Sequence, residues 1–302
     1  MTLEISFFNL QMTNLFIGLF SRHPLLRPHS MSIYRLGYSI HSIEPSFTSQ
    51  ENTVNPEAIA HSPTRQHTLL TEWTAAQSLS YEKKEQIRRY LLVNASELET
   101  NAGVPLDACS SCSIWVMVLP TSLQTFQDII DATSSDRLLL CSFDQLLTGE
   151  YCIKFHSGSI CDTELSSILT QTMKFKRIPE GYLPIPMENL RDQRVTDGVV
   201  QQVVAFLIKK KYEFSVEDIC EAMIGIWTYF QNDKKTAIRG AVKRVMRELS
   251  CQNYCRDWLT YNSPNWKAHN LSKSKLDKFI YAVQVDVLIP DDELSTDSVS
   301  EE

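Results

Sequence analysis

The chain has 302 residues, of which 43% are hydrophobic and 22% are charged. These proportions are typical of a globular protein with room for two modest domains, and they exclude collagen-like, disulfide-dense and membrane-spanning chains. The formal net charge of −7, from 29 basic and 36 acidic residues, argues at first against a nucleic-acid partner, because phosphate binding depends on Lys and Arg.

The charge is, however, unevenly distributed along the sequence. Residues 286–302 contain seven acids and no Lys or Arg, so the rest of the chain carries no net charge. Residues 189–281 contain sixteen Lys and Arg against ten Asp and Glu, a net charge of +6. A basic block followed by an acidic tail is typical of a nucleic-acid-binding module with a solvated end. We interpret residues 286–302 as an acidic disordered tail that binds a partner or masks the basic block.

The first 68 residues have the composition of a disordered lead-in. Residues 5–43 contain no acid, three Arg and several Ser, a composition that also resembles a mitochondrial presequence. Residues 44–68 are polar and interrupted by three prolines. The apolar run over residues 15–20 is far shorter than the ~20 residues that a membrane span needs. We therefore predict disorder over residues 1–68, with a targeting peptide as the alternative.

Residues 69–178 have the pattern of a small α+β module. Some segments repeat apolar residues at helical spacing, and others are short continuous apolar runs typical of buried strands. The predicted helices cover residues 80–98, 123–132 and 163–172, and the predicted strands cover residues 114–119, 138–143 and 151–155. Prolines at positions 179, 184 and 186 then break regular structure, so we predict a linker over residues 179–195.

Residues 196–266 are predicted to form three helices and a hairpin. The helices cover residues 199–211, 215–226 and 236–249, and strand-favouring residues over 254–261 precede a turn at 262–264. Ser215 and Asp218 approximate a capping box at the second helix. This order is that of a winged-helix domain, which residues 267–285 follow as an extension. The predicted fold class is α+β: a small N-terminal α+β module followed by a helical winged-helix-like domain, with disordered tails.

The third predicted helix carries a basic outer face. Arg239, Lys243 and Arg247 fall four residues apart, and Arg244 lies beside them. A helix with this charge can enter the DNA major groove and use its cations for phosphates and guanine edges. A solvated helix face is the alternative interpretation. We add three flanking cations as candidate DNA contacts: Lys234, Lys235 and Arg256.

Other motifs do not predict a catalytic or metal site. Cys109 and Cys112 have the spacing of a zinc or redox pair, but the second pair, Cys251 and Cys255, lies in a different predicted module, so we predict no metal. There is no phosphate loop, no GxSxG and no HExxH, and we predict no cofactor and no enzymatic activity. The nearest approach to a catalytic dyad is His156 with the thiols of Cys152 or Cys161. The aromatic residues that could stack on bases lie in apolar runs and are interpreted as core: Trp115, Trp227, Trp258, Tyr229 and Phe230.

The segments 181–187, 199–206, 215–223 and 238–249, with the preceding apolar strand and helix over 114–130, together resemble the storkhead-box winged-helix family. The helix over 217–223 and the aromatic turn over 227–230 also look like the distantly related forkhead domain. This resemblance implies a DNA-binding regulator in the nucleus. The family's Gly-Tyr-Phe-Ile wing is replaced here by residues 258–261, Trp-Leu-Thr-Tyr.

The function predicted from the sequence is a DNA-binding transcriptional regulator that reads duplex DNA with the third helix. The alternative is an interaction adaptor whose winged helix docks a protein partner. Neither function involves a membrane or a small-molecule substrate. We expect the nucleus as the compartment, with the mitochondrion or the cytoplasm as alternatives.

Overall fold

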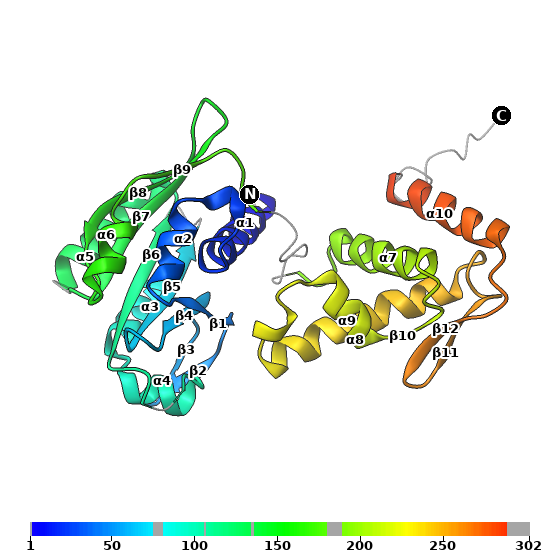
Figure 1. Ribbon diagram of the computed structural model, residues 1–302, viewed down its shortest axis with the longest axis horizontal. Helices are drawn as coiled ribbons and strands as arrows, with labels where there is room; N and C mark the ends of the chain where they lie inside the picture. Colours follow the sequence, from blue (N-terminus) through cyan, green and yellow to red (C-terminus); the bar gives the residue numbers. More distant parts are fainter. Residues whose placement is uncertain (1, 75–80, 106, 134–135, 180–188, 289–302) are drawn as a thin grey trace, which may run out of the picture. The chain divides into compact units, whose positions relative to one another are not determined.

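The computed structural model describes the whole chain except residues 1, 75–80, 106, 134–135, 180–188 and 289–302. The chain divides into two compact units, which are described separately (Figure 1). Unit 1 comprises residues 1–183 together with residues 226–232, and unit 2 comprises residues 184–225 and 233–302.

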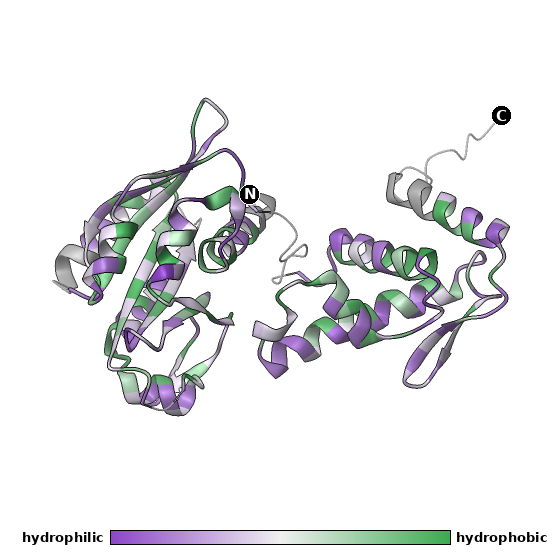
Figure 2. Ribbon diagram, in the orientation of Figure 1, coloured by the Kyte–Doolittle hydropathy of each residue, from purple (hydrophilic) through white to green (hydrophobic). Residues whose placement is uncertain are grey.

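Unit 1 is built on a seven-stranded mixed sheet with the order β1-β4-β5-β6-β7-β8-β9. The three central strands, β5, β6 and β7, are parallel, and the outer strands pair antiparallel. The strand bounds are β1 (Ser39–Ile43), β4 (Ala58–Ser62), β5 (His67–Thr74), β6 (Ser111–Val118), β7 (Leu138–Gln145), β8 (Tyr151–Gly158) and β9 (Met173–Phe175). A separate hairpin pairs β2 (Phe47–Ser49) with β3 (Asn52–Val54). The central strands are buried on both faces over most of their length, as strands between two helical layers must be. Apolar residues predominate in β6 and β7, whereas β5 also carries buried polar residues (Figure 2).

One face of the sheet is covered by the helices that connect the parallel strands. α3 (Tyr81–Leu92) and α4 (Ala95–Asn101) join β5 to β6, and α5 (Leu123–Thr133) joins β6 to β7. Their buried residues form one core with the even-numbered side chains of the strands, among them Tyr90, Leu98, Phe126, Leu70, Val116 and Leu140. Both crossovers cover the same face, so the order of the parallel strands does not reverse. The parallel part of the sheet therefore has no topological switch point, which is the place where doubly wound sheets bind ligands.

The N-terminal helix α1 (Thr2–Phe20) covers the opposite face together with α2 (His29–Arg35) and α6 (Thr163–Leu169). Met12, Leu15 and Phe16 of α1 are completely buried. The Phe16 ring lies 5.9 Å from the Trp73 ring of β5, measured between centroids. α1 is therefore part of the core of unit 1.

The predicted disorder over residues 1–68 is wrong, because this segment forms two helices, four strands and the start of β5. The absence of acids over residues 5–43 is compatible with burial against the sheet. The other predicted elements of the first half are confirmed, with shifted ends: the helix predicted over residues 80–98 is two helices, α3 and α4, separated by a capping box at Asn94 and Glu97.

The described residues of unit 2 form four helices and a small antiparallel sheet with the order β10-β12-β11. Its elements are α7 (Gln193–Ile208), β10 (Glu213–Ser215), α8 (Val216–Met223), α9 (Asn232–Cys251), β11 (Leu259–Asn262), β12 (Asn265–Ala268) and α10 (Lys273–Leu288). The capping box expected at α8 is present, because the Ser215 hydroxyl accepts from Asp218 N–H at 3.0 Å and the Asp218 carboxylate accepts from Ser215 N–H at 2.6 Å. The three predicted helices are confirmed as helices.

The predicted fold class is nevertheless wrong. The chain is a mixed α/β protein dominated by a curled seven-stranded sheet in its N-terminal region, and not a small module followed by a helical winged-helix domain. The sequence suggested a small module because residues 1–68, which supply β1, β4 and most of one helical layer, were assigned to disorder. Among the described residues, no helix is long and apolar enough to cross a membrane.

Candidate nucleic-acid interface

The long helix α9 separates an apolar face from an exposed face. Ile238, Val242 and Val245 are at most 1% exposed and form part of the core of unit 2. The exposed face carries four residues that follow one another at intervals of three or four: Thr236, Gly240, Lys243 and Arg247. We call these four residues the α9 stripe. No acid occurs between Thr236 and Arg247, so the stripe is polar and positively charged.

Two of the predicted DNA contacts are engaged within unit 2. Arg239 donates two hydrogen bonds to the carboxylate of Glu217 on α8, at 2.6 and 2.9 Å. Arg244 donates to the Leu190 carbonyl at 2.9 Å and lies 3.5 Å from the Glu248 carboxylate. These contacts hold α9 against α8 and the chain before α7. A basic residue on the outer half of a helix can therefore serve the packing of that helix.

The other predicted contacts differ in their surroundings. Lys243 and Arg247 are exposed, and neither forms an ion pair with any residue that the structure describes. Lys234 and Lys235 lie half-buried in the first turns of α9. Arg256 is exposed beside Asp257, with 3.8 Å between the guanidinium Nε and the carboxylate. The cations available for a partner are thus concentrated at Lys243 and Arg247.

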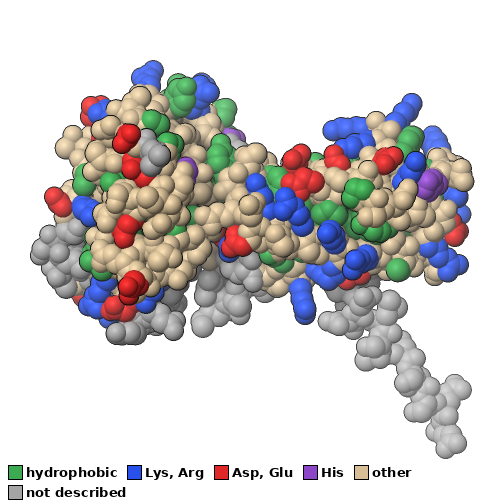
Figure 3. Space-filling model, turned by 90° about the horizontal axis from the view of Figure 1, so that it is seen from below, with side chains coloured by type: hydrophobic (Ala, Val, Ile, Leu, Met, Phe, Trp, Pro, Cys, Tyr) green, Lys and Arg blue, Asp and Glu red, His purple; other side chains and the backbone are tan. Residues whose placement is uncertain are grey.

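Lys and Arg side chains are widely distributed over unit 2. In Figure 3 they outnumber Asp and Glu over the part of this face that belongs to unit 2, the right-hand part of the view. Lys211, in the chain between α7 and β10, forms an ion pair with Asp218 at 2.5 Å. Burial acts to raise the pKa of Asp218, but this contact and the Ser215 hydrogen bonds lower it to about 2. Asp218 therefore carries its charge at neutral pH and offsets that of Lys211.

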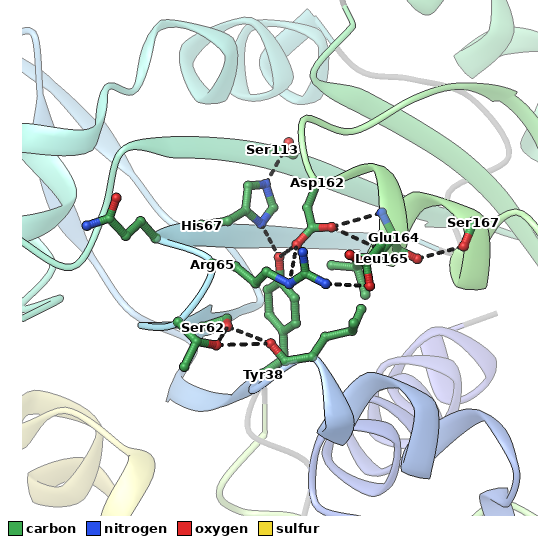
Figure 4. A network of polar contacts seen from close by, with 12 residues as sticks. Tyr38, Ser62, Arg65, His67, Ser113, Asp162, Glu164, Leu165 and Ser167 are labelled. Atoms are coloured by element: carbon green, nitrogen blue, oxygen red, sulfur yellow. Dashed lines mark hydrogen bonds and ion pairs between the residues drawn. The ribbon is translucent and has the colours of Figure 1, made fainter.

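A network of polar side chains in unit 1 was not predicted from the sequence (Figure 4). It joins four residues from the chain before β1, from β5, from β6 and from the start of α6: Tyr38, His67, Ser113 and Asp162. The His67 ring contacts Tyr38 Oη through Nδ1 at 2.6 Å and Ser113 Oγ through Nε2 at 2.9 Å. Tyr38 Oη donates to Asp162 Oδ2 at 2.8 Å.

The hydrogen bonds of this network can be assigned a direction. The single hydroxyl hydrogen of Tyr38 is given to Asp162, so His67 donates from Nδ1 to Tyr38 and accepts at Nε2 from Ser113. Ser113 Oγ in turn accepts from the backbone N–H of Cys161 at 2.9 Å. This arrangement requires a neutral imidazole. Burial is the main cause that lowers the pKa of His67 to about 4, which keeps the ring neutral at physiological pH.

Asp162 anchors the end of the network at the start of α6. Its carboxylate caps α6 by accepting from the N–H groups of Glu164 and Leu165, each at 3.0 Å, and it lies 3.8 Å from Arg65. Burial opposes ionisation of Asp162, but the hydrogen bonds from Leu165 and Tyr38 and the charge of Arg65 outweigh it and lower the pKa. Asp162 in its charged form raises the pKa of Tyr38, a shift to which burial contributes most.

The network resembles a serine–histidine–carboxylate arrangement in its residue types, but Ser113 is completely buried and His67 is 1% exposed. A substrate could not reach the Ser113 hydroxyl without separating β6 from its cover. The geometry therefore favours a structural role, in which the network ties the N-terminal segment and α6 to the central strands.

A second buried polar group lies on the other face of the sheet. The Glu72 carboxylate of β5 is completely buried, forms an ion pair with Lys83 of α3 and accepts from Tyr90 Oη at 2.6 Å. Burial raises the pKa of Glu72, and Lys83 acts against this effect. Breaking one partner of such a pair leaves a buried charge without compensation, so the pair fixes α3 on β5.

The thiols and histidine considered in the sequence analysis have other neighbours in the structure. His156 contacts Ser142 Oγ at 2.7 Å, and not Cys152 or Cys161. Cys112 is buried beside the Arg137 guanidinium, and burial raises its pKa to about 11, so its thiol is protonated at neutral pH. Within the described part of the chain, no three His, Cys, Asp or Glu side chains lie close enough to hold a metal ion.

The interpretation of the aromatic residues as core is confirmed for the tryptophans and Phe230, which are at most 4% exposed. Tyr229 differs, with 37% of its side chain exposed. Phe230 and its neighbours belong to unit 1, where Phe230 bridges Ile43 at the free edge of β1 and Gln231 accepts from Ser46 N–H at 3.1 Å.

Comparison with known protein families matches residues 9–179 to the MJECL32 domain, which is more than half of the chain. The chain belongs to the MJECL32 domain family. The matched residues begin within α1 and end at residue 179, four residues after β9, so the family domain coincides with the sheet of unit 1 and both of its helical layers. Comparisons with curated proteins and with solved structures find no match.

The resemblance to the storkhead-box family is wrong, because the family that matches is the MJECL32 domain, and neither a storkhead-box nor another winged-helix family is found. Most of the segments that suggested the resemblance lie outside the MJECL32 domain, whereas residues 114–130 lie inside it and residues 181–187 are outside the described part of the chain. Several of these segments are amphipathic helix patterns that unrelated helical units share.

Proposed function

We propose that this MJECL32-domain protein binds duplex DNA through the α9 stripe and acts as a DNA-binding regulator. The observation that supports the proposal is the pair Lys243 and Arg247, exposed one turn apart on a long helix that has no acid between Thr236 and Arg247. An α-helix fits the major groove, and cations at this spacing can contact successive phosphates along one strand or the edge of a guanine.

Three further features support the same surface. Gly240 leaves open space on the stripe, since a Cβ built there meets nothing within 4 Å, and a small residue lets a partner approach the helix closely. Arg239 and Arg244 fix the position of α9 through their contacts with Glu217 and Leu190. The hairpin of β11 and β12 is hydrophilic over most of its length and supplies additional exposed polar residues (Figure 2).

The test is a fluorescence-anisotropy titration of a labelled duplex with the whole chain over a range of salt concentrations. Replacing Lys243 and Arg247 together by Ala removes two cations of the stripe. We expect weaker binding and a plot of log affinity against log salt that is flatter by about 0.9 for each phosphate that is no longer neutralised.

Replacing Lys209 and Lys210 by Ala is the matched control, because these lysines are exposed in the same unit and the change in net charge is identical. The control should retain most of the affinity. Equal losses in both variants would mean that the charge of unit 2 acts without a defined surface. Absence of binding at low salt by both the unmodified chain and a chain without the acidic residues 289–302 would overturn the proposal and favour the alternative, a protein-docking adaptor. The compartment stays a prediction, with the nucleus first.

A further inference from the structure

The α9 stripe and the C-terminal end of the chain carry opposite charges. Residues 289–302 contain six acids and no Lys or Arg. The stripe contains Lys243 and Arg247, which form no ion pair within the described residues. Two oppositely charged segments of one chain attract each other over about 8 to 10 Å at physiological ionic strength, and the tether that joins them raises their effective concentration.

The position of α10 brings the start of this acidic segment within reach of the stripe. The Phe279 ring of α10 packs against Tyr254 and Trp258, with ring centroids 6.2 and 5.3 Å apart. Tyr254 follows the end of α9 at Cys251 by three residues. The C-terminal helix is therefore anchored beside the end of α9 that carries Arg247.

The chain distances show that residues 289–302 are long enough to reach the α9 stripe. From Phe279 to Leu288 the helix rises about 14 Å, and from Tyr254 back to Arg247 the chain spans at most about 16 Å. Even if these steps, the ring contact and the two aromatic side chains all pointed in one direction, Leu288 would lie within about 45 Å of Arg247. Fourteen residues span up to about 48 Å when extended, so the last acids can reach the stripe in any arrangement of α10.

We propose that residues 289–302 bind the α9 stripe and compete with DNA for it. This inference rests on the proposed function for its consequence, but the contact itself does not require DNA. Because the contact is electrostatic and tethered, it should be strong at low salt and absent at high salt. The segment also contains Ser295, Ser298 and Ser300, and a phosphate on any of them would add negative charge and strengthen the contact.

The contact is tested without DNA by a carbodiimide, which joins a lysine amine to a carboxylate that touches it. In the whole chain at low salt, we expect a cross-link between Lys243 and an acid of residues 289–302, identified by mass spectrometry and abolished at high salt. Cross-links confined to the nearer lysines of α10, Lys273, Lys275 and Lys278, would overturn the proposal.

The competition is tested by removing residues 289–302 or by replacing their six acids with Asn and Gln at constant length. Both variants should bind a labelled duplex at least threefold more tightly than the whole chain at 50 mM salt, as an order-of-magnitude expectation for a few screened ion pairs, and the difference should vanish at high salt. Identical isotherms would overturn the competition and leave the proposed function standing. If neither the whole chain nor the truncated chain binds DNA, the proposed function fails, and the cross-link alone decides whether the contact exists.

Discussion

The neutral imidazole of His67 predicts a specific sensitivity of unit 1 to acid. His67 has its usual pKa of 6.5 in the unfolded chain and a pKa of about 4 in the folded protein, mainly because it is buried. Between these two values the unfolded chain binds a proton that the folded protein does not. The stability contributed by neutral His67 is therefore fully present above pH 6.5 and declines as the pH falls toward 4.

The magnitude follows from the size of the shift. Each pKa unit corresponds to about 1.4 kcal/mol, so protonation of the unfolded chain should cost unit 1 about 3 kcal/mol between pH 6.5 and pH 4. The charged groups that face His67 have opposite effects on its pKa, because Asp162 raises it whereas His61 and Arg137 lower it. Burial decides the sign, and the loss is a substantial part of the 5 to 15 kcal/mol typical of a domain.

The assay compares the unmodified protein with His67→Gln, which has a neutral side chain that still donates and accepts hydrogen bonds. Urea unfolding is measured at several pH values between 7 and 4.5, with peptide-resolved hydrogen exchange on β5 to follow unit 1. Carboxylates remote from His67 titrate equally in both proteins, so the difference between the two curves reports on His67 together with Asp162, whose pKa His67 lowers. We expect His67→Gln to be the less stable protein at pH 7 and to lose this disadvantage as the pH falls.

Parallel curves would refute the reasoning, because they would show that His67 takes up its proton at the same pH in the folded and the unfolded chain. An NMR titration of labelled histidine in the unmodified protein gives an independent answer. A His67 resonance that titrates near pH 6.5 would contradict the buried, neutral ring.

Three further substitutions test the packing. Phe16→Ala should destabilise unit 1 by about 3 to 5 kcal/mol in a thermal or urea melt, because the Phe16 ring is completely buried. An unchanged melt would instead favour disorder of the N-terminal segment. Gly158→Ala should cost about 3 kcal/mol or more, since Gly158 has a φ of +86° and a Cβ there would lie 1.9 Å from the Leu138 carbonyl oxygen; normal stability would show that the β7–β8 register is different. Gly240→Ala should instead stabilise unit 2 by about 1 kcal/mol, because this exposed helical glycine meets nothing, and a loss of stability would mean that its surroundings are not open.

The sequence predicted elements best where a local pattern decides the structure. Short apolar runs become central strands such as β6 and β7, and the capping box at Ser215 and Asp218 begins α8 as expected. These signals depend on neighbours within a few residues, so a single sequence contains them in full.

The N-terminal segment was misjudged because its partner is distant in the sequence. Met12, Leu15 and Phe16 do follow helical spacing, but without the sheet they are an apolar run in an acid-poor segment, which composition alone cannot separate from a targeting peptide. Their role becomes visible only when Trp73 is placed opposite Phe16. The polar network has the same origin, since Tyr38 and Asp162 are 124 positions apart and meet only in the folded sheet.

The candidate interface shows where the charge pattern is informative and where it is not. Periodicity correctly separates the buried face of α9 from its outer face, but it cannot distinguish a cation that holds the helix from one that is available to a partner. Arg239 is of the first kind because Glu217 lies 22 residues earlier on α8, and Lys243 is of the second. The substitution Arg239→Ala should therefore loosen α9 and lower stability, whereas Lys243→Ala should leave stability unchanged and weaken DNA binding. A melt in which both variants behave alike would show that the ion pair does not position α9, and the assignment of the α9 stripe would lose its structural support.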